Sequence, residues 1–250
     1  MKNNLKQRLY AGETCFGTWI TIANPDIVEI LKQIGFEWFV FDMEHSYLSI
    51  ETVKTMMQAL GSGGPSPMVR IGQVDQLLVK RALDAGSEGL LVPLVNNAED
   101  AERVVRYSMY PPAGVRGAGP GRASQFGMNF SEYLRQANLE IMLCVQIETK
   151  EALSNVDEIL DTKGIDVGFV GPTDLTISLG LLDDRANPKV MEAMERAIKS
   201  CKSHGKIPGT LAVSVEEARK FVKMGFKFVA LASDSRFLAY GAREYLKAKD

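Results

Sequence analysis

The feature that most constrains this chain is an alternation, repeated eight times, between short apolar runs and segments with helical periodicity. Several runs are apolar almost throughout, as in LLVPLV and FVALA, which is typical of strands buried on both faces of a parallel sheet. The eight runs are Phe16–Ile22, Trp38–Met43, Pro67–Ile71, Gly89–Val95, Ile141–Ile147, Val167–Val170, Ile207–Val213 and Lys227–Ala232. Eight strand–helix units predict an α/β fold, a (β/α)8 barrel, and nothing marks a second, smaller domain. We therefore expect residues 1–250 to form a single barrel domain.

The segments between these runs carry helix boundary signals. Asn24 before Pro25 is typical of a helix cap and first turn, and Ser214 with Glu217 has the spacing of a capping box. Glycines expected in the left-handed position just past a helix are Gly35, Gly86 and Gly225.

Composition narrows the class of protein. Hydrophobic residues make up 46% of the chain and charged residues 24%, and 29 basic against 31 acidic residues give a net charge of -2. This balance argues against nucleic acid as the main partner. No run approaches the roughly 18 apolar residues of a membrane span, and the first residues lack the apolar core of a signal peptide. We expect a cytoplasmic protein that does not associate with a membrane. Its cysteines, Cys15, Cys144 and Cys201, are expected to be reduced.

Polar side chains cluster at the end of the second run. Asp42, Glu44 and His45 directly follow the apolar stretch WFVF, and buried ionisable groups are costly unless they are paired or used. Active sites of such barrels lie at the carboxyl ends of the strands, which favours a catalytic role for His45 over a structural one. The other histidine, His204, fits a surface or helix-capping position.

The third run ends at Arg70. A surface arginine at a strand end is one interpretation. The apolar neighbours Met68, Val69 and Ile71 equally allow a guanidinium that faces the barrel mouth, where it would suit a carboxylate or a developing enolate oxygen.

Carboxylates also follow the fifth and sixth runs. Gln146 and Glu148 are two residues apart and so share one face of a strand, and Asp174 follows the next strand in GPTDL. Two adjacent carboxylates repel unless a cation lies between them, and oxygen ligands suit Mg²⁺ or Mn²⁺. The alternative is two unrelated, salt-bridged acids. Gly171 and Pro172 begin a helix whose backbone amides could hold a substrate carboxylate. A cation, a base, an arginine and an amide cradle together describe proton abstraction beside a carbonyl, as in a pyruvate half-reaction.

At these residues the chain resembles the metal-dependent class II pyruvate aldolases of the 4-hydroxy-2-oxo-heptanedioate aldolase/citrate lyase family. The resemblance covers nearly the whole length and rests on the segments FDMEHS, PMVRIG, KRALDAG, LLVPLV, YPPAGVRG, VQIET and GPTDLT. It implies a barrel of the phosphoenolpyruvate/pyruvate type, a divalent cofactor (Mg²⁺, Mn²⁺ or Co²⁺), and oxo acid and aldehyde substrates.

The resemblance also implies roles for individual residues. His45 would be the general base, tuned either by Asp42 or by Asp84 from a neighbouring subunit, and Arg70 would stabilise the enolate or the aldol oxyanion. The metal ligands would be Glu148 and Asp174. Substrate contacts would come from Trp19, Gln146, Gly171, Pro172, Asp174 and the backbone amide of Thr173.

Two features depart from the family pattern. Met43 stands where a glycine is usual, and the loop AGPGRASQFG, which contains residues 119–127, is shorter than in similar members. Met43 would narrow the surroundings of the base, and the loop is expected where aldehyde specificity is set. Both bear on the substrate more than on the chemistry.

Three other functions fit parts of the pattern. A CoA-ester lyase of the citrate lyase β-subunit type would need a basic path for the CoA phosphates, and no glycine-rich phosphate loop is present. Decarboxylation of oxaloacetate, as in macrophomate synthase, would use the same enolate as a side activity. A barrel that only binds an oxo acid has no need of a base.

The last apolar segment, Arg236–Lys247, predicts a helix with apolar residues around much of its surface. Such a helix needs a surface to cover. It could close its own barrel as an eighth helix. The resemblance instead implies exchange of this helix between subunits of a homo-oligomer, a hexamer built as a trimer of dimers.

Overall fold

The computed structural model of the protein describes residues 2–182 and 184–249, and these form a closed barrel of parallel strands. The strands follow one another around the barrel in chain order, and the last pairs with the first. Their bounds are Cys15–Ile20 (β1), Trp38–Asp42 (β2), Ser66–Arg70 (β3), Gly89–Val92 (β4), Met142–Ile147 (β5), Val167–Val170 (β6), Ile207–Ala212 (β7) and Phe228–Ser233 (β8). All eight expected runs are strands, with ends shifted by at most three residues, so the (β/α)8 prediction is confirmed.

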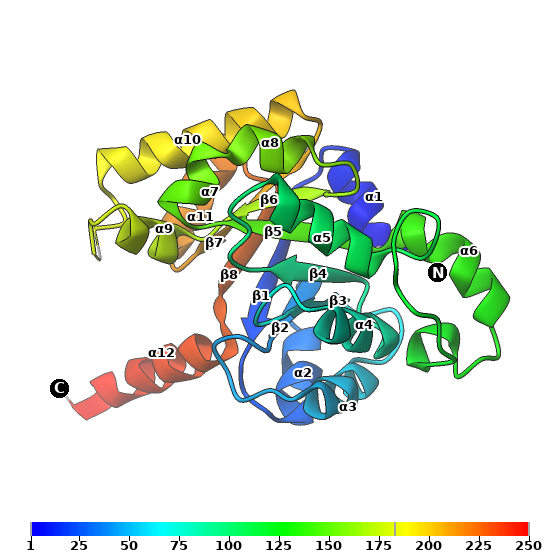
Figure 1. Ribbon diagram of the computed structural model, residues 1–250. Helices are drawn as coiled ribbons and strands as arrows, with labels where there is room; N and C mark the ends of the chain where they lie inside the picture. Colours follow the sequence, from blue (N-terminus) through cyan, green and yellow to red (C-terminus); the bar gives the residue numbers. More distant parts are fainter. Residues whose placement is uncertain (1, 183, 250) are drawn as a thin grey trace.

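Helices lie between the strands and cover the outside of the barrel (Figure 1). The α-helices are Asn4–Tyr10 (α1), Pro25–Lys32 (α2), Ile50–Leu60 (α3), Gln76–Asp84 (α4), Ala98–Ser108 (α5), Phe130–Glu140 (α6), Lys150–Ser154 (α7), Val156–Asp161 (α8), Pro172–Ser178 (α9), Pro188–Ser203 (α10), Val215–Met224 (α11) and Asp234–Leu246 (α12). Short 3-10 turns occur at Arg122–Ser124 (η1) and Lys247–Lys249 (η2). None of the helices in this described part of the chain is both long and apolar enough to cross a membrane.

The predicted helix boundaries are present. The side chains of Asn24 and Ser214 accept hydrogen bonds from the first turns of α2 and α11. His204 caps the end of α10, as expected. The glycines predicted beyond helix ends have positive φ angles, namely Gly35, Gly86 and Gly225.

The barrel interior is filled by apolar side chains from all eight strands. Trp38 stacks on Phe228 with ring centroids 3.9 Å apart. Gly17 makes this possible, because a Cβ at that position would lie 2.0 Å from the Trp38 ring. Leu5 and Leu9 of α1 pack against the same interior cluster. Because α1 also bonds to backbone just before β4 and β5, it closes the amino-terminal end of the barrel and leaves the carboxyl end open. The three cysteines are buried free thiols, as predicted.

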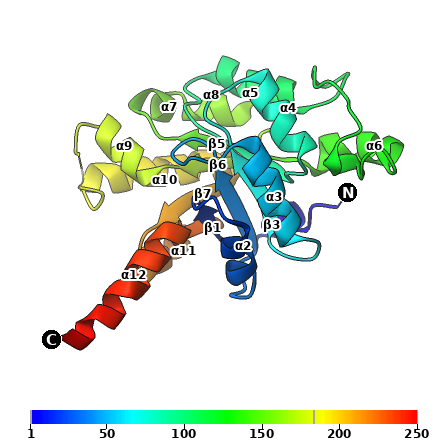
Figure 2. The ribbon, with the colours of Figure 1, turned by 90° about the horizontal axis from the view of Figure 1, so that it is seen from below.

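The last helix, α12, extends away from the barrel in both ribbon views (Figures 1 and 2). Asp234 is the one buried residue of this helix. Phe237 reaches back to stack on Phe36 with centroids 6.0 Å apart, whereas Leu238 and Tyr245 are 66% and 87% exposed. An apolar groove of about 1090 Å³ runs between α11 and the base of α12. Most of α12 therefore does not close the barrel of its own chain.

Candidate active site

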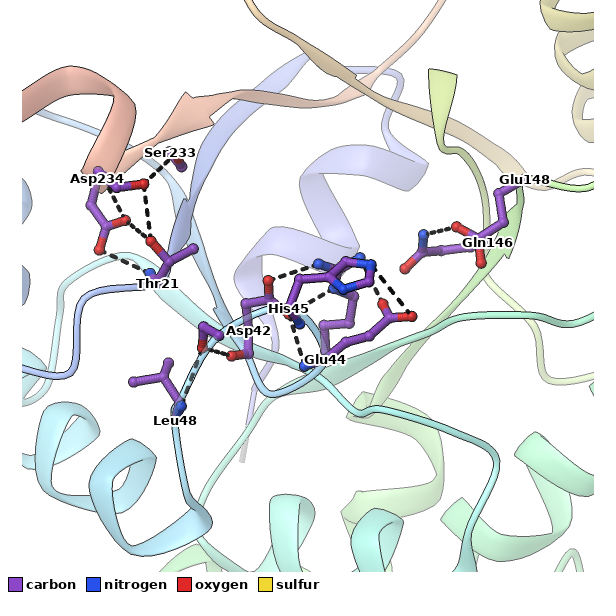
Figure 3. A network of polar contacts seen from close by, with 12 residues as sticks. Thr21, Asp42, Glu44, His45, Leu48, Gln146, Glu148, Ser233 and Asp234 are labelled. Atoms are coloured by element: carbon purple, nitrogen blue, oxygen red, sulfur yellow. Dashed lines mark hydrogen bonds and ion pairs between the residues drawn. The ribbon is translucent and has the colours of Figure 1, made fainter. Parts of the chain in front are cut away.

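Apart from Asp84, the side chains predicted to act in chemistry lie at the carboxyl ends of the strands, as Figure 3 shows for the group around His45 and the pair opposite it. β1, β2, β3 and β5 each contribute one or more of them, and the connection from β6 to α9 contributes the rest. The closed barrel brings together strand ends that are far apart in the sequence.

Asp42 and Arg70 form the buried centre of this group. Strand register pairs the two residues directly, since Asp42 ends β2 and Arg70 ends β3. The guanidinium donates from Nε to Asp42 Oδ1 at 2.8 Å and from Nη2 to Oδ2 at 2.7 Å. One face of Arg70 lies 4.2 Å from the centre of the Trp19 ring. Arg70 is therefore buried and paired, which decides against a surface arginine.

Asp42 also shapes the turn that carries the histidine. Its Oδ1 accepts hydrogen bonds from the backbone N–H of Glu44 at 3.0 Å and of His45 at 3.3 Å. The side chain of Asp42 thus contacts the backbone of His45 and the side chain of Arg70. A contribution of Asp42 to the basicity of the imidazole would act through this turn.

Glu44 makes contacts that could not be predicted from the sequence. Its Oε2 lies 2.7 Å from Arg70 Nη1, and its Oε1 lies 3.9 Å from His45 Nε2. Burial raises the pKa of the Glu44 carboxyl, Arg70 and His45 lower it, and the charges of Asp42 and Asp174 raise it. The His45 side chain itself is 66% exposed at the barrel mouth. The clustering of acids in DMEH was the signal available in the sequence.

Gln146 and Glu148 lie across the barrel mouth from this group (Figure 3). Both are buried, and the Gln146 amide donates to Glu148 Oε2. Glu148 Oε1 accepts the backbone N–H of Leu94 at 2.8 Å. Leu94, in the loop after β4, has a φ of 55°, an uncommon conformation for a non-glycine residue, and nothing in the sequence signalled it.

Burial raises the pKa of Glu148 to about 7, although the Leu94 hydrogen bond lowers it. The neighbouring charges of Asp174 and Glu44 raise it further. Asp174 itself is exposed in the first turn of α9. The charge of Asp174 thus contributes to raising the pKa of Glu148, after burial.

The start of α9 is open to a ligand. Gly171 is its N-cap and makes no side-chain capping hydrogen bond, and Pro172 occupies the first turn. A Cβ on Gly171 would lie 3.2 Å from Glu148 Oε2, so the absence of a side chain keeps space beside that carboxylate. Thr173 is exposed. The free first turn fits the predicted amide cradle.

The residues present fit a divalent cation. Four carboxylates gather here, and their charges raise the pKa values of Glu44 and Glu148: Asp42, Glu44, Glu148 and Asp174. Arg70 forms ion pairs with two of them, Asp42 and Glu44. Within the described ranges no group of three or more His, Cys, Asp or Glu side chains is arranged to hold a metal. Two carboxylates with an excess of negative charge and open positions suit Mg²⁺ or Mn²⁺, which retain water ligands.

Three buried polar atoms in this region lack hydrogen-bond partners in the part of the chain that the structure describes. These are Trp19 Nε1, a donor, and two acceptors, Gln146 Oε1 and Glu44 Oε2, of which the latter is ion-paired with Arg70. Buried groups of this kind are normally satisfied, and a bound ligand or water can supply the partner. Trp19 and Gln146 belong to the set predicted to contact substrate.

Asp84 lies elsewhere in the chain. It ends α4, which runs antiparallel to the strands, and its Oδ1 accepts a hydrogen bond from Arg116 Nη2 at 2.8 Å. Gly121 in the loop 119–127 packs against the Asp84 backbone, so this loop lies beside Asp84 and not at the mouth of the same barrel. For Asp84 or the loop 119–127 to act near His45, that histidine must belong to a second subunit. This role stays a prediction.

Met43 does not face the imidazole. Its half-buried side chain packs against the apolar cluster between the strands and the outer helices. Its effect on the base would therefore act through the backbone of the turn, rather than by filling space beside His45.

Comparison with known proteins agrees with this geometry. The model of the family described as HpcH/HpaI aldolase/citrate lyase matches residues 15–240. A 4-hydroxy-2-oxo-heptane-1,7-dioate aldolase of Salmonella dublin is 41% identical over 244 residues, covering 97% of this chain and 92% of the relative. The crystal structure of a HpcH/HpaI aldolase/citrate lyase family protein from Burkholderia cenocepacia J2315 matches with a TM-score of 0.95 and 34% identity over 99% of both chains. That of the citrate synthase SbnG matches with a TM-score of 0.89 and 26% identity, covering 98% of this chain and 96% of SbnG.

Proposed function

Because the chain belongs to the HpcH/HpaI aldolase/citrate lyase family, we propose that it cleaves a 4-hydroxy-2-oxo acid reversibly to pyruvate and an aldehyde through a pyruvate enolate. An aldolase function, that of a carbon–carbon lyase, is supported by the names of its relatives. The observation that carries the finer proposal is the accessible imidazole of His45 beside the paired guanidinium of Arg70, opposite the carboxylate of Glu148.

In the cleavage direction, the reaction needs a base for the hydroxyl proton and positive charge at the carbonyl. His45 would take the proton of the 4-hydroxyl group as the bond between C3 and C4 breaks and the aldehyde leaves. The electrons of that bond form the enolate. The imidazolium would then return the proton to C3, which gives pyruvate.

Arg70 would stabilise the oxygen on which negative charge develops. Its orientation is already set by Asp42, Glu44 and the Trp19 ring, so it need not reorganise during the reaction. Gln146 and the free amide of Thr173 would orient the oxo-acid end of the substrate.

Glu148 and Asp174 would hold the divalent cation, whether Mg²⁺, Mn²⁺ or Co²⁺. When bound there, it supplies positive charge that stabilises an oxyanion next to a carbonyl carbon. The raised pKa of Glu148 supports this assignment, because a cation would offset the burial that chiefly raises it and the smaller repulsion from Asp174 and Glu44.

The competing functions make different demands. A CoA-ester lyase would require the CoA phosphates to bind near the mouth, and the 41% identical relative named as an aldolase favours cleavage of a free oxo acid. A barrel that only binds an oxo acid would not lose a catalytic activity on addition of a chelator. We also propose that residues 1–250 act as one domain in the cytoplasm.

The test is an aldehyde panel with pyruvate and a divalent metal, with products identified by mass spectrometry. We expect 4-hydroxy-2-oxo acids to form, to be lost after chelation and to return on addition of Mn²⁺. Metal-independent binding of pyruvate without any condensation product would favour the binding protein, and turnover of a CoA ester alone would favour the lyase.

A further inference from the structure

The carboxylate of Glu44 links two side chains with different chemical abilities (Figure 3). Its Oε2 is ion-paired with Arg70 Nη1 at 2.7 Å, and its Oε1 faces His45 Nε2 at 3.9 Å. The Glu44 side chain is 15% exposed, against 66% for His45. Glu44 is therefore held by the buried Arg70 and faces the exposed imidazole of His45.

Arg70 has a limited number of N–H groups to offer a substrate. A guanidinium carries five N–H donors. Two of these bond Asp42, whereas Nη1 is held 2.7 Å from Glu44 Oε2 by an ion pair that lacks hydrogen-bond geometry. The Trp19 ring covers one face. Only the donors that these partners leave free can reach a substrate oxygen, so Glu44 helps to decide which way they point.

Keeping a charge at Glu44 is costly to the fold. Burial raises the pKa of its carboxyl, and the negative charges of Asp42 and Asp174 act in the same direction. Asp42 alone already provides Arg70 with a bidentate partner. A second, partly buried carboxylate is therefore not needed to satisfy the charge of Arg70.

We propose that Glu44 is a positioning residue for both halves of the reaction, fixing the free N–H groups of Arg70 with one oxygen and the imidazole of His45 with the other. The proposal rests on the proposed aldolase function. It assigns Glu44 no contact with substrate. Its two oxygens serve steps that can be measured separately.

The contributions of His45 and Arg70 can be measured separately, because the enolate can be reached by two routes. Exchange of the pyruvate methyl protons with solvent needs a base to remove a proton, and so depends on both His45 and Arg70. Decarboxylation of oxaloacetate breaks the bond between C3 and the departing carboxylate, whose electrons form the same enolate as CO₂ leaves. C3 then takes a proton, and no base is needed to reach the enolate. This route depends on Arg70 but not on His45 as a base.

The experiment measures both rates in metal-loaded wild type, Glu44→Ala and Glu44→Gln, with Glu51→Gln as the control. Glu51 is an exposed acid in the first turn of α3, outside the site. Glu44→Ala should lower kcat for both reactions, by roughly tenfold to a hundredfold, because both partners lose their orientation. Glu44→Gln keeps one acceptor oxygen for Arg70 but turns an amide N–H toward His45. It should lower proton exchange about tenfold and leave decarboxylation within roughly threefold. The control should match wild type.

A crystal structure of Glu44→Ala provides the second measurement, with displacement of the Arg70 guanidinium expected. Rates within about twofold of wild type in Glu44→Ala, or an unmoved Arg70 and His45, would overturn the proposal. So would equal losses of both reactions in Glu44→Gln, since the two oxygens would then not act separately. If wild type catalyses neither reaction with any divalent metal, the proposed function itself is wrong, and the Glu44 role in it is rejected with it.

Discussion

Arg70 and Asp42 are joined by two parallel hydrogen bonds of 2.8 and 2.7 Å between side chains that end adjacent strands. Both residues are buried. The planar guanidinium matches a carboxylate in this bidentate way, whereas an ammonium group acts as a point charge. Strand register therefore places Arg70 directly beside Asp42, its bidentate partner.

Arg70→Lys should lower kcat for retro-aldol cleavage by roughly 10²–10³-fold, the loss typical of removing an oxyanion donor. Lysine keeps the positive charge but loses the bidentate bond to Asp42 and the planar contact with Trp19. Steady-state kinetics on a 4-hydroxy-2-oxo acid would measure this, with circular dichroism as the control for folding. A variant with more than a tenth of the wild-type kcat would mean that charge alone suffices at this position.

Glu148→Gln and Asp174→Asn should each abolish metal-dependent activity while the fold survives. Each change removes one of the two carboxylates proposed to hold a hard cation, and the remaining one is too weak a site alone. Binding of Mn²⁺ can be followed by electron paramagnetic resonance, independently of turnover. Near-normal activity at low metal concentration in either variant would show that the metal site lies elsewhere.

The raised pKa of Glu148 predicts how the metal-free protein responds to pH. Its folded-state value of about 7 exceeds the ordinary 4.5, so the folded state binds this proton more tightly than the unfolded state does. The stability gained from the proton is fully present below pH 4.5 and is lost as pH rises through about 7. Glu148→Gln has no carboxyl group to deprotonate at this position, so it does not lose this stability as the pH rises.

With a chelator present, Glu148→Gln should therefore be more stable than wild type at pH 8, by an upper limit on the order of 3 kcal/mol. The difference should shrink toward pH 4.5. Thermal unfolding of both proteins across this range measures it. Mn²⁺ should then stabilise wild type at pH 8 and have little effect on the variant. A variant less stable than wild type at pH 8 would contradict the assigned pKa.

His45→Ala should slow exchange of the pyruvate methyl protons with solvent by roughly 10²–10⁴-fold, the effect typical of losing a general acid–base group. The imidazole is exposed and faces Glu44 Oε1 at a distance of 3.9 Å, so the fold and metal binding should be little changed by its loss. Proton NMR in D₂O measures the exchange. An unaltered rate would identify another group as the base and return His45 to a structural role.

Much of this arrangement could be predicted from the sequence, because strand ends in a parallel barrel converge. Apolar runs located the strands, and the polar residues directly after them, such as His45, Arg70 and Glu148, lie at the barrel mouth. The pairing of Glu44 with Arg70 could not be predicted, since it depends on the conformation of the turn after β2. Neither could the Leu94 contact to Glu148, which requires an unusual backbone angle.

The expected place of Met43 and of the loop 119–127 shows a different limit. Its position next to a catalytic residue in the sequence suggests that Met43 lies near the imidazole, but the alternation of side chains turns Met43 toward the outer apolar cluster. The loop packs on Asp84, whose helix ends at the opposite end of the barrel from the strand ends. Only in an oligomer could the loop 119–127 or Asp84 of one subunit lie close to the His45 of another.

The exposed surface of α12 predicts that the active unit is a homo-oligomer. Leu238, Tyr240 and Tyr245 are 64% to 87% exposed, and only the first residue of the helix is buried. Large apolar side chains exposed along one helix are unfavourable in water unless another chain covers them. The adjoining groove of about 1090 Å³, lined by apolar residues of α11 and the start of α12, continues the same face.

We therefore expect light scattering to give an oligomer, a hexamer if the arrangement is a trimer of dimers, and specific activity to fall on dilution. Truncation after Ser235 should give unstable or aggregating protein, because it removes the helix but leaves the groove uncovered. Tyr245→Asp tests the contact in the full-length chain, since it places a charge on an exposed residue remote from the barrel mouth. It should weaken assembly while leaving the fold of each chain intact, as judged by circular dichroism. A sharp monomer peak with full specific activity at assay concentration would contradict the prediction, because Asp84 could then not reach any His45 from a neighbour.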